Sequence, residues 1–200
     1  MEDWKGDSRL AQRTLSRLAK ASTVISACQK CSRWEQALEL LGAMPGLRIT
    51  PNVITFSAAI SACEKPGHWQ RALALLGAMP AARAEPNTIS FNAAISVCKN
   101  AGHWKRAFAQ LGAMPAARAK PDTISFNAAI SACKKAGHWQ LALALLGAMP
   151  AARAEPNTIS FNAAISVCKN AGHWKRAFAQ LGAMPAARAK PDTISFNPAR

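Results

Sequence analysis

The chain has 200 residues, half of them hydrophobic, and 25 basic against 10 acidic side chains give it a formal charge of +15. This hydrophobic content excludes intrinsic disorder, and no uninterrupted apolar run approaches the ~20 residues that a membrane-spanning helix requires. The positive charge favours a polyanionic partner, such as nucleic acid or an anionic membrane, although a solvated surface is the simpler alternative.

The N-terminal stretch, residues 1–21, differs in character from the rest. Four basic residues at spacings of four, four and three would share one face of a helix: Arg9, Arg13, Arg17 and Lys20. Organelle transit peptides are rich in Arg and Ser and poor in acids, whereas Glu2, Asp3 and Asp7 crowd this start. We therefore predict that residues 1–17 form either a basic helix that caps the domain or a targeting segment.

From residue 18 onward the sequence repeats with a period of 35 residues and no gaps. Residues 88–122 recur letter for letter as residues 158–192. A fixed period of this size is typical of stacked repeats, each of which buries its apolar face against its neighbours. We therefore divide the chain into five units and the truncated start of a sixth: 18–52 (degenerate), 53–87, 88–122, 123–157, 158–192 and 193–200.

The first half of each unit has the pattern of an amphipathic helix. Phe56, Ile60 and Cys63 fall at i, i+4 and i+7, which places them on one face. Thr55, or Ser90 in the next unit, is a candidate cap just after a Pro-Asn or Pro-Asp pair.

The second half of each unit predicts another helix after a glycine turn. His68 and its counterparts are candidate caps, and apolar residues at spacings of three and four follow from Trp69 to Met79. Gly77 and Pro80 disfavour helix and should keep this segment short. The sequence thus predicts an all-α, right-handed α-solenoid of tandem 35-residue helix–turn–helix repeats.

The cysteines do not point to chemistry. Five of the six recur at one position per unit, as small core residues would (Cys28, Cys63, Cys98, Cys133 and Cys168). Helices of neighbouring repeats lie about 10 Å apart, which is too far for disulfides. The Cys-x4-His pair of each unit offers two ligands where a closed zinc site needs four, and Cys28-x2-Cys31 has no strand beside it. We expect no metal, no cofactor and no enzymatic activity.

The unit resembles the pentatricopeptide repeat, which is also 35 residues long. The matching features are Thr/Ser-Phe-Asn/Ser at 55–57, 90–92, 125–127 and 160–162, Ile-Ser in the middle of the first helix, and Pro-Asn or Pro-Asp at the end. The tetratricopeptide pattern W-x2-L-G-x2-Y does not fit, because the chain has no tyrosine and its tryptophan follows Gly-His.

This resemblance implies single-stranded RNA binding, with one base read per repeat. The implied base-reading residues follow the Phe and the Pro, and they pair as Ser57 with Asn87, Asn92 with Asp122, Asn127 with Asn157, Asn162 with Asp192, and Ser22 with Asn52 as a fifth pair. The family code then suggests the target 5′-AAUYU-3′. Turn and N-cap chemistry favours the same residue types after a proline and is the alternative explanation.

Two further sets of residues acquire roles through the resemblance. The isoleucines Ile54, Ile89, Ile124 and Ile159 would sandwich successive bases, with packing between repeats as the alternative. The lysines Lys30, Lys65 and Lys135 would contact phosphates, with a solvated face as the alternative.

The expected function is therefore RNA processing, stability or translation in a mitochondrion or plastid. The protein would occupy a site on single-stranded RNA, or recruit an RNA-processing enzyme held on another chain, with no membrane partner. The alternative is a tetratricopeptide-like scaffold whose groove binds an acidic peptide.

Overall fold

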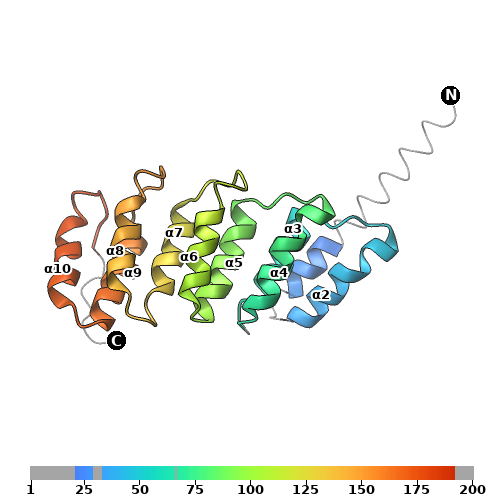
Figure 1. The fold of residues 1–200 in the computed structure, drawn as a ribbon, viewed down its shortest axis with the longest axis horizontal. Coiled ribbons are helices and arrows are strands. Elements are labelled where there is room, and N and C mark those ends of the chain that lie inside the picture. Colours follow the sequence, from blue (N-terminus) through green and yellow to red (C-terminus); the bar gives the residue numbers. More distant parts are fainter. Residues whose placement is uncertain (1–20, 29–32, 66, 192–200) are drawn as a thin grey trace, which may run out of the picture. The chain divides into compact units, whose positions relative to one another are not determined.

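The structure is a computed structural model that describes residues 21–28, 33–65 and 67–191. The predicted N-terminal segment 1–17, the sixth-repeat start 193–200, Lys30 and Asp192 lie outside these residues. Within them the regular structure is entirely helical (Figure 1). After the helical residues 21–28, the α-helices are α2 (Trp34–Ala43), α3 (Val53–Ala62), α4 (Trp69–Ala78), α5 (Thr88–Asn100), α6 (Trp104–Ala113), α7 (Thr123–Ala132), α8 (Trp139–Ala148), α9 (Thr158–Asn170) and α10 (Trp174–Ala183).

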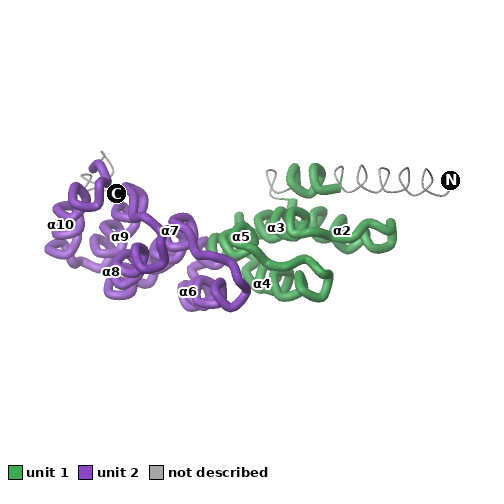
Figure 2. Tube along the Cα trace, turned by 90° about the horizontal axis from the view of Figure 1, so that it is seen from above, with its two compact units in different colours: residues 1–97 green, residues 98–200 purple. Residues whose placement is uncertain are grey.

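The chain divides into two compact units, Met1–Val97 and Cys98–Arg200 (Figure 2). In the first unit, α3 packs against both α2 and α4. In the second, α7 packs against α6, α8 and α9, and α9 packs against α8 and α10. Each unit is thus a stack of helical hairpins, and the prediction of an all-α fold of tandem helix–turn–helix repeats is confirmed. The exact repeat boundaries drawn from the sequence stay a prediction.

The N-cap of the first helix lies three residues before the predicted cap. Asn52 is the N-cap of α3, and its Oδ1 accepts from the Thr55 backbone N–H at 3.0 Å. The Thr55 hydroxyl accepts in turn from the Asn52 backbone N–H at 2.9 Å, which completes a capping box. The prediction of Thr55 or Ser90 as the cap was therefore wrong: both residue types cap well, but here the threonine or serine occupies the third helical position.

The second helix of each hairpin starts at a tryptophan, and the histidine before it stands at the N-cap position. The side chain of His68 makes no capping hydrogen bond, so its predicted capping role was also wrong. Its ring instead packs on Trp34 of the preceding hairpin, with 4.4 Å between centroids. Trp104 and His138 in the second unit do the same at 4.2 Å. The aromatic pair thus joins successive hairpins rather than closing a helix end.

A tight turn ends the second helix. Pro80–Ala82 forms a 3-10 turn after α4, and the next residue, Arg83, has a left-handed backbone with φ of 57°. The same φ region recurs at Arg48, Arg118, Arg153 and Arg188. For a residue other than glycine this conformation costs roughly 1–2 kcal/mol. The short second helix expected from Gly77 and Pro80 is confirmed, since α4 stops at Ala78.

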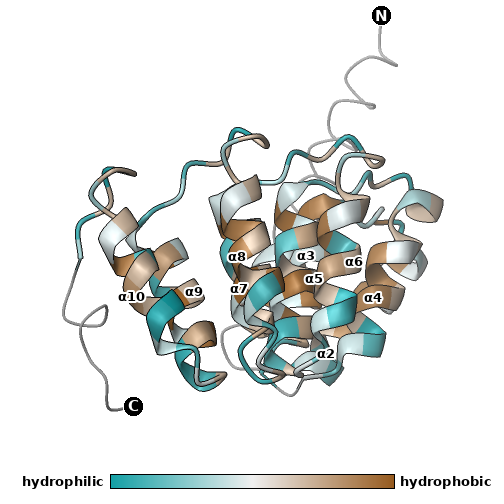
Figure 3. Ribbon diagram, turned by 60° about the vertical axis from the view of Figure 1, so that its left-hand side comes forward, coloured by the Kyte–Doolittle hydropathy of each residue, from teal (hydrophilic) through white to brown (hydrophobic). Residues whose placement is uncertain are grey.

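The core consists of the stripe predicted for the first helix together with the methionine after the second. Phe56, Ile60, Cys63 and Met79 are all buried. Figure 3 shows apolar residues concentrated along the helices and polar residues prominent in the connecting loops. In the part of the chain that the structure describes, no helix has the length and hydropathy needed to cross a membrane.

The cysteines of the described residues are free and buried, as predicted for core positions. Burial raises the pKa of Cys98 and of Cys133 to about 11, so both thiols stay protonated near neutral pH. Protonated thiols are poor nucleophiles and poor metal ligands. Consistently, no group of three or more His, Cys, Asp or Glu in the described ranges is placed to hold a metal ion.

Candidate nucleic-acid interface

One isoleucine at the start of each first helix is exposed to solvent. Ile54, Ile89, Ile124 and Ile159 are 62 %, 67 %, 63 % and 65 % exposed. Each is the second residue of its helix, so its side chain leaves the helix before the core-facing stripe begins. Packing between repeats therefore does not account for these positions. A repeated exposed aliphatic side chain is available to cover the face of a flat ligand.

The residue after each phenylalanine lies between hairpins. Ser57 is buried, and its hydroxyl oxygen lies 2.9 Å from the Ser90 hydroxyl oxygen of the next hairpin, within hydrogen-bonding distance. Asn92, Asn127 and Asn162 are half-buried. The Oδ1 atom of Asn127 is fully buried and has no hydrogen-bond partner among the described residues. A buried acceptor without a partner is unusual, because buried acceptors are normally paired.

The residue after each second proline caps the following helix. Asn87 Oδ1 accepts from the Ser90 backbone N–H at 3.1 Å, Asp122 Oδ1 from that of Ser125 at 2.8 Å, and Asn157 Oδ1 from that of Ser160 at 3.0 Å. These residues therefore do act as N-caps, as the alternative explanation proposed. The acceptor in each of these bonds is Oδ1, which Asn and Asp have in common. Their other side-chain atom is a donor in Asn and an acceptor in Asp.

In the first unit, the residue after the phenylalanine and the residue after the second proline line one cavity of about 240 Å³ together with two exposed isoleucines. It is lined by Ser26, Val53, Ile54, Ser57, Ala58, Ser61, Asn87 and Ile89. The structure thus brings together a complete predicted set: the pair Ser57 and Asn87 and the isoleucines of two successive repeats. The sequence analysis missed Ser26 and Ser61. Both follow a predicted base-reading serine, Ser22 or Ser57, by four residues, one helical turn, which is the signal that could have found them.

The predicted phosphate-binding lysines behave differently from one another. Lys65 is exposed, whereas the Lys135 ammonium donates to the Asn100 carbonyl oxygen at 2.9 Å, at the C-terminal end of α5. A cation at this position satisfies a terminal carbonyl and offsets the helix dipole. Lys135 therefore has a structural partner within the protein. Of the fifth pair, Ser22 is half-buried in the helical residues 21–28, and Asn52 caps α3.

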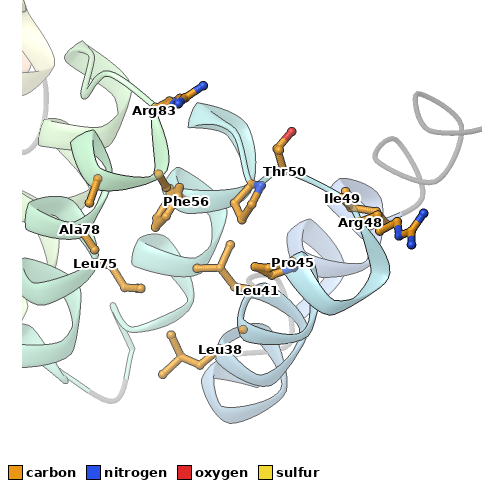
Figure 4. Close-up of a pocket in the computed structure, with 14 residues that line it drawn as sticks. Leu38, Leu41, Pro45, Arg48, Ile49, Thr50, Phe56, Leu75, Ala78 and Arg83 are labelled. Atoms are coloured by element: carbon orange, nitrogen blue, oxygen red, sulfur yellow. The ribbon is translucent and has the colours of Figure 1, made fainter. Parts of the chain in front are cut away.

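A larger cavity in the first unit contains none of the predicted base-reading residues. Its volume is about 950 Å³, and most of its lining comes from the segments that follow α2 and α4, with side chains of α2, α3 and α4 completing the wall. Figure 4 shows Leu38, Leu41, Phe56 and Leu75 directed toward one another across it, with Arg48 and Arg83 at the rim. The sequence analysis gave no indication of this cavity, because its wall forms only when two hairpins stack.

Comparison with known proteins identifies the repeat. A family model described as the pentatricopeptide repeat domain matches residues 19–66, 74–135 and 111–171, together more than half of the chain. The chain belongs to the pentatricopeptide repeat family. A comparison with curated proteins found no match to this pentatricopeptide repeat chain.

Solved pentatricopeptide repeat structures share the fold. The pentatricopeptide repeat domain of Arabidopsis thaliana protein-only RNase P 1 (PRORP1), solved with tRNA, superposes with a TM-score of 0.73 at 14 % identity, over 89 % of this chain and 94 % of that one. PPR10, solved with an 18-nucleotide psaJ RNA element, gives 0.72 at 25 % identity and covers 90 % of this chain. The chain spans only 25 % of PPR10, a protein also solved from maize.

Proposed function

We propose that this pentatricopeptide repeat protein binds single-stranded RNA and reads one base per repeat, with 5′-AAUYU-3′ as the preferred sequence. The observation that carries the proposal is the cavity that joins Ser57 and Asn87 to Ile54 and Ile89. It combines two aliphatic side chains with hydroxyl and amide groups. That combination suits a base, which needs its faces covered and its edge hydrogen-bonded.

The alternation of Asn and Asp after the second proline supports base reading. Asn and Asp are about equally good N-caps, so capping alone gives no reason to alternate them between near-identical repeats. Their second side-chain atom differs: in Asp it is a carboxylate oxygen, a type of acceptor that can pair with the N3–H of uracil. Asn87 and Asn157 present an amino group, which can donate to an unprotonated ring nitrogen of adenine or cytosine.

The amide side chain of Asn127 suits the same assignment for the fourth repeat. Cytosine carries an exocyclic amino group that donates hydrogen bonds. An amide oxygen is an acceptor for such a bond. PPR10 and PRORP1 were both solved with RNA, and this likeness supports RNA as the partner of the present chain.

The mechanism that follows is occupancy rather than chemistry. A bound repeat array covers its RNA site, keeps it single-stranded, or holds a processing enzyme carried on another chain beside it. We place this activity in a mitochondrion or plastid, in keeping with the organellar role inferred for the family. A localisation experiment tests this compartment, since a solved structure of the same fold, PRORP2, is described as nuclear.

A titration with three labelled oligonucleotides tests the proposal. We expect RNA containing AAUCU to bind at physiological salt, and a scrambled RNA and the matching DNA to bind more weakly. Equal, weak binding of all three would contradict base reading and leave only charge. The acidic-peptide scaffold would then be the better explanation, with the apolar cavity between Arg48 and Arg83 as its surface.

Changing Asn157 to Asp should alter the preference at the fourth base. The variant is expected to shift selectivity from cytosine toward uracil by about 1–3 kcal/mol, the usual discrimination of a hydrogen-bonded base contact. Stability should hardly change, because Asp caps α9 as well as Asn does. The measurement is the ratio of dissociation constants for AAUCU and AAUUU.

The matched control for this variant is Gln140→Glu, which adds the same charge at an exposed position in the first turn of α8. It should weaken binding to both RNAs equally and leave their ratio unchanged. The assignment of Asn157 as a base-reading residue fails if the two variants have the same ratio.

A further inference from the structure

Five arginines occupy a backbone conformation that favours glycine. Arg48, Arg83, Arg118, Arg153 and Arg188 have φ between 55° and 58°, and they are the only positive-φ residues other than glycine in the described part of the chain. We call them the loop arginines. Each stands in the loop that joins one hairpin to the next, four residues before the Asn or Asp of the next Pro-Asn or Pro-Asp pair.

The turn itself demands this conformation. The Arg83 backbone N–H donates to the Pro80 carbonyl, and the Ala84 N–H donates to the Met79 carbonyl, each at 2.9 Å. This pair of bonds closes a Schellman-type turn, in which the residue after the helix adopts a left-handed conformation and is usually glycine. Ala84 and its counterparts are buried and anchor the turn. The backbone at the arginine therefore has no less strained alternative.

The same hairpins do use glycine at their other left-handed position. Gly67, Gly102, Gly137 and Gly172 turn the chain between the first and second helix with φ between 67° and 79°. Each hairpin thus has two left-handed positions, one occupied by glycine and one by arginine. Backbone geometry explains the glycines, whereas it disfavours the arginines. The guanidinium group is the remaining reason for an arginine there.

In the part of the chain that the structure describes, no partner explains the guanidinium groups. All five side chains are exposed. Within the described ranges, none of them has a recorded side-chain hydrogen bond or ion pair. Figure 4 shows Arg48 and Arg83 at the edge of the first unit's larger cavity, with their guanidinium groups directed away from its apolar side chains. Among the described residues, therefore, no side-chain contact of the loop arginines offsets the strain.

In the second unit these loops lie beside the helix starts that carry the base-reading residues. The Thr123 hydroxyl donates to the Glu155 carbonyl at 3.1 Å, and the Thr158 hydroxyl donates to the Lys190 carbonyl at 3.0 Å. The loops after Arg153 and Arg188 are thereby fixed against the first turns of α7 and α9. Exposed Ile124 and Ile159 belong to those same turns.

We propose that the loop arginines are phosphate-binding residues that hold the RNA backbone beside the base-reading positions; this inference rests on the proposed RNA binding. A guanidinium binds a phosphate through two parallel hydrogen bonds. A phosphate site one repeat apart suits a strand read one base per repeat. The loop arginines would supply the phosphate contact that was predicted for Lys135. The Lys135 ammonium is less free to make it, because it already donates to the Asn100 carbonyl.

Replacing Arg118, Arg153 and Arg188 with glycine in the full chain separates strain from function. Glycine relieves the left-handed strain, so the melting temperature should stay the same or rise. The affinity for AAUCU RNA should fall roughly tenfold at low salt. The slope of log affinity against log salt should lose about 2 in magnitude, because each single-strand phosphate contact contributes about 0.7.

Two control variants fix the interpretation. The triple Lys105→Gln, Lys134→Gln and Lys175→Gln removes the same charge from exposed positions of the second unit outside these loops, and it should change the slope less. Replacing the three arginines with Gln keeps the strain, removes the charge, and should weaken RNA binding as glycine does. Equal effects of the arginine and lysine triples, or unchanged binding in the arginine variants, would overturn the inference. A wild-type chain that binds no RNA would instead refute the proposed function itself.

Discussion

Replacing Ile54, Ile89, Ile124 and Ile159 together with alanine is expected to weaken RNA binding about 1000-fold while leaving the fold intact. The four side chains are 62–67 % exposed in the free protein, so their truncation removes little buried area. Burial of apolar groups stabilises by ~0.8 kcal/mol per methylene. If each isoleucine covers a base, its loss costs on the order of 1 kcal/mol, and four such losses correspond to about three orders of magnitude in Kd.

Fluorescence anisotropy with AAUCU RNA measures this effect, and circular dichroism checks that the helices remain. Leu47→Ala is the matched control, because Leu47 is 61 % exposed but lies in the 3-10 turn Pro45–Leu47. It should bind RNA like the wild type. A quadruple variant with an unchanged Kd would show that the exposed isoleucines do not contact bases.

The same substitution six residues further along α7 should have the opposite consequences. Ile130 is fully buried, whereas Ile124 is 63 % exposed. Ile130→Ala leaves a cavity in the stack and should lower the free energy of unfolding by about 2–5 kcal/mol. Ile124→Ala should lie within about 0.5 kcal/mol of the wild type, as surface substitutions usually do.

Urea unfolding followed by circular dichroism measures the free energy of unfolding of each variant. The Kd for RNA of the folded variants is then compared. Ile124→Ala should lose affinity while staying stable. Ile130→Ala, measured well below its melting temperature, should bind RNA like the wild type. Equal destabilisation by the two substitutions would mean that Ile124 packs between repeats, the alternative that its exposure disfavours.

The helices could be predicted from the sequence because local rules fix them. The spacing of Phe56, Ile60 and Cys63 defined the buried face, and Gly77 with Pro80 defined where the second helix weakens. The start of the first helix was misplaced because Asn52 and Thr55 are both good caps. Only the backbone geometry shows that Asn52 is the cap and Thr55 the third residue of the helix.

For the candidate site, the sequence could predict only which positions of each repeat contribute, not how they lie in space. The sequence located Ser57 and Asn87 through the likeness of the repeat to a known family. That both line one cavity with Ile54 and Ile89 depends on how two hairpins stack. The hydrogen bond between the Ser57 and Ser90 hydroxyl groups also joins residues 33 apart, whose distance no local pattern specifies.

By itself the sequence determined the repeat, its period, its helices and the apolar stripe that makes them stack, since all of these follow from residues within one turn or one unit. The tertiary structure alone decided that Ile124 is exposed rather than packed between repeats and that His138 packs on Trp104. It also decided that arginine occupies the strained turn. The first two features depend on the neighbouring hairpin, one repeat of 35 residues away. The turn depends on the buried residue that follows each arginine and anchors the backbone.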